Sequence, residues 1–137
     1  MAGSFVFGRT VRANALAETV IPILIDSLVR SGYRLKSRPG MLPAELRWGS
    51  LALEVTMEFV PGAMLIPGVW KKSMPAQVTV SLLEATESSC VVRVASKPLL
   101  PYGEMAKPHF SRHVDQIVEA LEHSSISAEA DPITDTA

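Results

Sequence analysis

The sequence predicts an α+β fold, a two-layer sandwich in which one antiparallel sheet of about five strands has two helices packed on one face. Several short segments alternate apolar and polar residues, which is typical of strands with one buried and one solvated face. Two longer segments, one near each end of the chain, have apolar residues at helical spacing. The length of 137 residues, with 47% hydrophobic and 20% charged residues, suits a single domain with its own core.

The expected order begins with a strand and a helix. Residues 5–11 mix aromatic and β-branched residues and predict the first strand. Asn14 is a suitable N-cap for a helix over residues 15–31, which ends where Gly32 provides a left-handed residue. Pro22 has no backbone N–H to donate, so the helix either kinks there or begins only a few residues before it.

Five further segments predict the remainder of the sheet. Residues 33–37 and 44–48 read as short strands, and residues 51–59 show the clearest alternation in the chain. Residues 77–84 and 90–96 repeat that alternation on either side of a polar turn. Because each segment has one apolar and one polar face, we expect an antiparallel sheet with one face in water.

The second helix is expected over residues 108–123, with Pro108 in its first turn. Its apolar residues fall on one side, as in a helix that lies on a sheet. Residues 124–137 contain small and acidic residues without periodicity, and we expect them to form a disordered acidic tail. The globular domain would then span residues 1–123.

The order strand, helix, four or five strands, helix over residues 5–123 resembles the helix-grip or START-like superfamily, and also smaller folds with this order. The helix-grip resemblance implies a protein that holds an apolar ligand between the sheet and the C-terminal helix, with cyclases and hydrolases among its relatives. It rests on element order and transfers no role to an individual residue.

Charge is unevenly distributed along the chain. The formal net charge is -1, which gives no general electrostatic reason to bind nucleic acid, and we expect none to be a partner. Residues 30–112 nevertheless hold 11 Lys and Arg against 6 Asp and Glu, whereas residues 113–137 hold six acids and no Lys or Arg. The middle of the chain is therefore basic and its last part acidic.

A cytoplasmic location is expected. The single cysteine, Cys90, excludes an intramolecular disulfide and a cysteine-based metal cluster, as is usual in a reducing compartment. The first residues lack the basic and apolar regions of a signal peptide. The apolar run in residues 15–29 is interrupted by two acids and is shorter than the ~20 residues of a membrane span.

Three connections between the expected strands are apolar and framed by proline: residues 38–43, 60–75 and 98–107. In an antiparallel meander every second connection lies at the same end, so the last two would share one end of the sheet. The first joins them if Gly49-Ser50 is a tight hairpin turn. The candidate binding residues on these connections are Met41, Leu42, Met64, Leu65, Ile66, Trp70, Lys71, Lys72, Leu99, Leu100 and Tyr102.

Three interpretations of this apolar, basic-rimmed loop end remain open. The loops can fold back as a small core that closes the sandwich. They can form an exposed patch for a protein partner or for self-association, since large apolar patches usually mark contacts. They can also dock on an anionic membrane surface, which aromatic and lysine residues favour.

Our first hypothesis is a non-catalytic binding module that uses the loop end for a protein partner or a second copy of itself. The alternative is a START-like protein with a pocket under the C-terminal helix, either binding a hydrophobic small molecule or acting as a small cyclase or hydrolase. A sealed core with an exposed loop end would favour the first, and polar groups inside a pocket would favour the second.

The residues that could carry chemistry form weak patterns. His109 and His113 are spaced i, i+4, as two ligands of a metal on one helix face would be, but no local motif provides a third ligand. Cys90 is expected to point inward, where cysteine behaves as a small hydrophobic residue. Glu54 and Glu58 share one solvated strand face, which is common without any catalytic role. We therefore assign no catalytic residue and expect no cofactor.

Overall fold

The computed structural model describes residues 6–38, 40, 42–48, 76–98 and 103–135. In this part of the chain, the structure confirms the α+β fold: one six-stranded antiparallel sheet with two helices that contact it. The strand order is β2-β3-β4-β5-β1-β6. The elements are β1 (Phe7–Ala13), α1 (Ala17–Ser31), β2 (Arg34–Leu35), β3 (Ala44–Trp48), β4 (Ala76–Ala85), β5 (Cys90–Pro98), α4 (Gly103–His123) and β6 (Ala128–Ala130).

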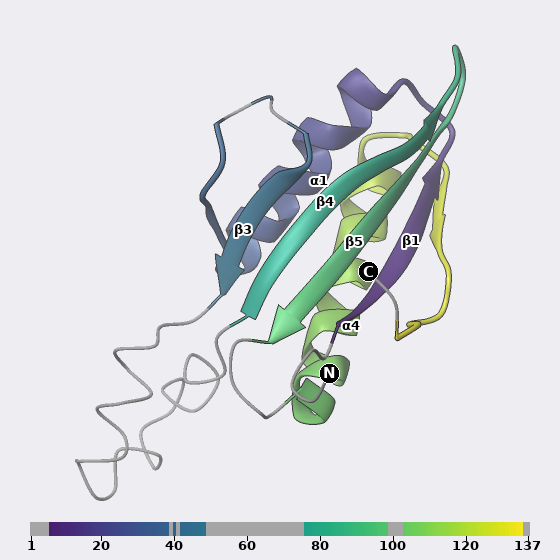
Figure 1. Ribbon diagram of the computed structural model, residues 1–137. Helices are drawn as coiled ribbons and strands as arrows, with labels where there is room; N and C mark the ends of the chain where they lie inside the picture. The colour runs from purple at the N-terminus through teal and green to yellow at the C-terminus, as the bar shows by residue number, and fades with distance from the viewer. Residues whose placement is uncertain (1–5, 39, 41, 49–75, 99–102, 136–137) are drawn as a thin grey trace, which may run out of the picture.

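Both helices lie on the same face of the sheet, and the two layers enclose the core (Figure 1). From the sheet, Val11, Val78 and Val94 are fully buried, and from the helices Leu24 and Ile117 are fully buried. Alternation places every second residue of a strand on this face. The remaining residues point to the opposite face of the sheet, which neither helix covers.

Helix α1 spans the predicted segment but is not capped as expected. It begins at Ala17, and the N-cap is Leu16, which makes no side-chain cap hydrogen bond, so the prediction of Asn14 as the cap is wrong. Pro22 lies inside the helix, beyond its first turn. Gly32 ends the helix as predicted, with φ 117°, and its N–H bonds back to the carbonyls of the last turn.

The described strands follow the predicted alternation. β3 covers the predicted residues 44–48, and both β4 and β5 slightly exceed the predicted strands over 77–84 and 90–96. β1 is two residues later than predicted. The register between β4 and β5 shifts near their connecting turn, between Leu82 and Glu84. The predicted strand over residues 51–59 lies outside the described residues.

Helix α4 is longer at its N-terminal end than the sequence pattern predicts. It begins at Gly103, so Pro108 lies inside the helix and not in its first turn. The apolar side of α4 packs as expected: Phe110, Val114 and Leu121 are buried in the core. Phe110 meets Phe7 of β1 edge to face, with 5.3 Å between ring centroids.

Residues 124–135 are ordered, so the expected disordered tail over 124–137 is wrong for this part. Ile126 is only 8% exposed and joins the core. β6 pairs antiparallel with the edge of β1, and Thr134 exchanges two backbone hydrogen bonds with Gly8 of β1. The segment has no apolar periodicity because it is held by backbone bonds to an open strand edge, which leave no side-chain pattern.

Arg9 ties the C-terminal segment to both layers. Its guanidinium donates to the carboxylate of Asp115 on α4 at 2.7 Å and to the carbonyl of Ser111 at 3.0 Å. It also donates to the carbonyl of Asp131 at 2.8 Å. Because the Arg9 side chain is only 10% exposed, these bonds also satisfy a largely buried charge.

The strand pairing corrects the predicted grouping of three loops. Trp48, at the end of β3, pairs with Ala76, where β4 begins, and Ala76 pairs with Pro98, at the end of β5. Segments 49–75 and 99–102 therefore leave the sheet at one end, as predicted. The predicted loop over residues 38–43 enters β3 at Ala44, which pairs with Val80 inside β4. Ala44 is the end of β3 away from Trp48, so the prediction that this loop joins the other two is wrong.

We predict that a chain ending at Ser125 is less stable than the full chain by about 3 kcal/mol or more, since it loses a buried isoleucine and two acceptors of Arg9. Urea unfolding followed by circular dichroism measures this difference. The control is a chain ending at Asp135, which keeps every described contact of the segment. Equal stability of the two shortened chains would show that the C-terminal segment does not belong to the domain.

Candidate functional site

Most of the binding residues predicted on the loops lie outside the described residues: Met41, Met64, Leu65, Ile66, Trp70, Lys71, Lys72, Leu99, Leu100 and Tyr102. Leu42 is described, is 40% exposed and lies in the β2–β3 connection, away from the ends of β4 and β5 where the other two loops attach. The predicted histidine pair on α4 is described in full. It belongs to the most distinctive cluster of side chains in the described structure.

Four aromatic rings from β3, α4 and the α1–β2 connection meet beside the N-terminal half of α4. His109 and His113 of α4 have ring centroids 4.3 Å apart. Trp48, the last residue of β3, lies 4.8 Å from His109 and 5.1 Å from His113. Tyr33, which follows α1, contacts both Trp48 and His113 at 5.2 Å. We call these four residues the ring cluster.

Gly32 allows Trp48 to approach the end of α1. A Cβ atom at position 32 would lie 2.5 Å from Cζ3 of the Trp48 ring, well inside van der Waals contact. The same residue needs the left-handed φ of 117° that ends the helix, a conformation that side chains other than glycine rarely adopt. Gly32 is therefore required by the backbone and by the indole ring at once.

A buried hydrogen bond joins the ring cluster across the two helices. The hydroxyl of Tyr33 and Nδ1 of His113 are 3.0 Å apart, and the side chains are 3% and 5% exposed. Burial raises the pKa of the Tyr33 hydroxyl, so this group stays protonated and can donate to the imidazole. The i, i+4 spacing places His113 on the same side of α4 as His109. The bond to Tyr33 then fixes the orientation of the His113 ring.

A groove of about 850 Å³ runs between α1 and α4. Trp48, His109 and His113 lie at one end of it, and His123 and Ser124 at the other. Its deeper part is formed by small or apolar side chains on facing turns of the helices. These are Ile23, Ser27, Ser31 and Ala120. The helices are joined across it by the hydroxyl of Ser31, which donates to Oε1 of Gln116 at 2.8 Å.

The rims of the groove carry both signs of charge. On α1, Asp26 and Arg30 form an i, i+4 ion pair at 2.9 Å, and both side chains are more than half exposed. On α4, Arg112 and Glu119 are exposed along the other rim. Two acids and two bases leave the rims without a net charge, so the groove does not select for a strongly cationic or anionic ligand.

The geometry gives no support to metal or thiol chemistry at these residues. Among the described residues, no group of three or more His, Cys, Asp or Glu side chains is arranged to hold a metal ion. Cys90 is 2% exposed, and burial raises the pKa of its thiol, which opposes the thiolate form that a nucleophile needs. Within the described part of the chain, no helix has the length and apolar character of a membrane span.

Sequence reasoning found the histidine pair but not the groove or the ring cluster. Tyr33, Trp48 and His113 are far apart in the chain, and only the tertiary arrangement brings them together. One signal is present in the sequence, because Gly32 is predicted to end the first helix directly before Tyr33. No protein-family model matches the chain, and the search of curated proteins found no significant match.

We predict that Gly32→Ala lowers the free energy of unfolding more than Gly40→Ala does. Both glycines have positive φ, but a Cβ atom at Gly40 meets nothing within 4 Å. Each substitution costs about 1 kcal/mol for the backbone, and Gly32→Ala costs about 1 kcal/mol or more in addition because it displaces Trp48. Urea unfolding of both variants tests this. Equal losses would mean that Trp48 does not rest on Gly32.

We predict that Tyr33→Phe lowers the free energy of unfolding by about 1 kcal/mol near neutral pH, through loss of the bond to His113. Because the folded-state pKa of Tyr33 is raised, its contribution is fully present below the unfolded pKa of about 10 and is lost as pH rises further. Unfolding curves measured between pH 7 and 11 should therefore fall more steeply for the wild type than for Tyr33→Phe. Parallel curves would contradict the buried state of Tyr33.

Proposed function

We propose that the protein is a non-catalytic binding module whose groove between α1 and α4 holds a segment of a partner protein. The observation that carries this proposal is the groove of about 850 Å³, with small and apolar residues in its depth and charges on both rims. A groove between two helices is a common way to recognise the apolar side chains of a protein segment.

The shape of the groove favours an elongated occupant. The lining residues of α4 extend from His109 to His123, which corresponds to about 20 Å along a helix. This length is enough for about six residues of an extended chain or about four turns of a helix. The groove therefore suits an extended chain, or the side chains along one face of a helix.

The rim charges favour a partner segment that carries both signs. Such a segment can pair acids with Arg30 and Arg112, and bases with Asp26 and Glu119. These exposed pairs contribute little affinity, about 0–1 kcal/mol each, but they select the orientation of the segment. Most of the affinity comes from apolar side chains that insert beside Ile23, Ala120 and Trp48.

The predicted apolar loops supply a second argument for a binding role at this place. Segments 49–75 and 99–102 connect to the sheet at Trp48, Ala76 and Pro98, and Trp48 itself lines the groove. The longer of the two segments therefore begins directly after Trp48, a residue that lines the groove. The binding role of the residues in these segments stays a prediction from the sequence, because they lie outside the described residues.

A ligand pocket of the helix-grip kind has less support. Such a pocket would lie between the sheet and α4. There, the fully buried side chains of Val11, Val94 and Ile117 meet, together with Phe7 and Phe110 in edge-to-face contact. The described groove is lined in part by exposed residues of both helices, such as Asp26 and Glu119, so a segment from outside can reach it.

The proposal is tested by selecting peptides of about 15 residues from a displayed random library on the full chain. The best peptide is then titrated by fluorescence anisotropy against wild type, Ala120→Arg and the control Leu83→Arg. Leu83 is 58% exposed beside the β4–β5 turn, far from the groove. We expect the dissociation constant to rise at least tenfold with Ala120→Arg and less than twofold with Leu83→Arg.

Ile23→Glu provides a second groove variant, and circular dichroism verifies that each variant is folded. Failure to select any peptide, or a peptide that binds Ala120→Arg and Ile23→Glu as tightly as wild type, would overturn the proposal. A dimer by light scattering that Ala120→Arg converts to a 14.8 kDa monomer would instead identify a second copy as the occupant.

A further inference from the structure

The face of the sheet opposite the helices carries a row of three basic residues and one glutamine, aligned across four strands. The strand register aligns Arg34 of β2 with Arg47 of β3, Arg47 with Gln77 of β4, and Gln77 with Lys97 of β5. Directly paired residues of antiparallel strands point to the same face, so all four side chains leave the sheet on the face that the helices do not cover. We call these four residues the basic row.

The basic row places like charges close together. Side chains opposite each other on neighbouring strands start about 5 Å apart, and like charges in this arrangement destabilise a sheet. Arg34 and Arg47 are such a pair. On β3, Glu45 is two residues before Arg47 and on the same face of the sheet, where it pairs with Thr79 of β4.

Arg47 adds an independent observation. Its Nε atom is buried and has no hydrogen-bond acceptor among the described residues, although the side chain as a whole is partly exposed. A buried donor without an acceptor costs about 1–3 kcal/mol. An oxygen atom of an anion placed above the row would accept from this group.

Protection of a sheet edge does not account for the row. Lysine and arginine on an edge strand discourage pairing with other chains, and this explains Arg34 of β2. Arg47 and Lys97 lie on β3 and β5, which have a strand on each side. Cations at interior positions of the sheet serve no such purpose.

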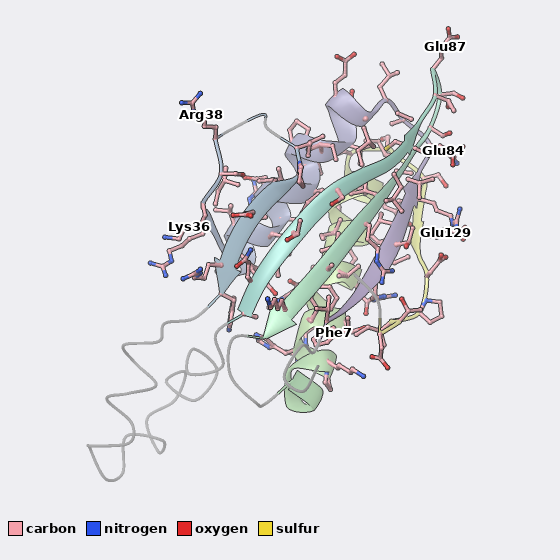
Figure 2. All side chains as sticks on the ribbon, in the orientation of Figure 1. Phe7, Lys36, Arg38, Glu84, Glu87 and Glu129 are labelled. Carbon is pink, nitrogen blue, oxygen red and sulfur yellow. The ribbon has the colours of Figure 1, made fainter. Side chains whose placement is uncertain are left out.

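Charge is also separated across this face. Figure 2 shows Lys36 and Arg38 beside β3, whereas Glu84 and Glu87 lie toward the tip of the β4–β5 hairpin and Glu129 lies beside β1. The basic row thus lies away from these carboxylates. An anion that approaches the sheet is attracted toward the row and repelled from the hairpin tip.

We propose that the basic row binds an oxyanion, a phosphate or carboxylate group of a ligand, on the face of the sheet opposite the proposed groove. Arginine suits this role because its planar guanidinium can donate two parallel hydrogen bonds to either group. One oxyanion bridges Arg34 and Arg47. Lys97 lies two strands further along, about 10 Å from Arg47, and receives a second anionic group of the same ligand.

The test follows the Nε–Hε signals of the arginine side chains by nitrogen-15 NMR of the full chain. Inorganic phosphate, pyrophosphate and citrate are added separately, with potassium chloride adjusted to keep the ionic strength constant. We expect a saturable shift of the Arg47 signal and little change for Arg12, which is on the same face of the sheet and is paired with Asp131 at 3.2 Å. A response to the phosphates alone identifies a phosphate ligand, and a response to citrate alone identifies a carboxylate ligand.

Matched variants separate the row from general charge effects. Arg47→Gln and Arg12→Gln remove the same charge, and the amide spectrum verifies that both are folded. We expect Arg47→Gln to weaken the anion at least fivefold, as read from backbone amides of β3 and β4, and Arg12→Gln to weaken it less than twofold. The proposal is wrong if none of the three anions gives a saturable shift, or if both variants weaken binding equally.

Discussion

The contact between Trp48 and Gly32 is the constraint on which the rest of the site depends. It sets the end of β3 against the end of α1, and no side chain at position 32 would allow the same approach. Tyr33 follows Gly32 directly, contacts the Trp48 ring and bonds to His113 of α4. The turn at Gly32 therefore positions the rings of Tyr33 and Trp48 against α4. The groove between the helices exists because this corner fixes how far apart α1 and α4 lie at one end.

The other side of the domain is held by a different kind of interaction. There, Arg9 joins β1 to α4 and to the segment after β6, through bonds to one carboxylate and several carbonyls. The ring cluster is built from contacts between aromatic rings and contains the Tyr33–His113 hydrogen bond, whereas the Arg9 contacts are charged and partly buried. The two arrangements contact different sides of the same part of α4, at His109 and His113 and at Ser111 and Asp115.

The sequence was sufficient for the elements that have a strong local pattern. The strands over residues 44–48 and 90–96 and the buried side of the second helix are predicted correctly, because their apolar spacing reflects which face is buried. The helix end at Gly32 is also predicted correctly, because glycine adopts the left-handed conformation found there. Partner choice has no such pattern. The direct pairing of β3 with β4, which moves residues 38–43 away from the other loops, depends on the tertiary fold. β6 is not predicted from the sequence. It has only three residues, two of them alanine, and its pairing with β1 uses backbone bonds that do not depend on the side-chain pattern.

The site was less predictable than the fold. The i, i+4 spacing drew attention to His109 and His113, but as possible metal ligands and not as part of an aromatic corner. Their partners, Tyr33 and Trp48, each looked like ordinary strand-edge or core residues, since their contacts join positions far apart in the chain. The basic row was visible only as an excess of Lys and Arg in the middle of the sequence until the strand register aligned its members.

The proximity of the Trp48 indole to Gly32 and to both imidazoles is tested most directly by nuclear Overhauser spectroscopy of the full chain. We expect cross-peaks from the indole protons to the Gly32 α-protons and to the ring protons of His109 and His113. We also expect an upfield ring-current shift of at least one Gly32 α-proton. Absence of these cross-peaks, with Gly32 α-protons at ordinary positions, would contradict the arrangement of the ring cluster and the groove that it supports.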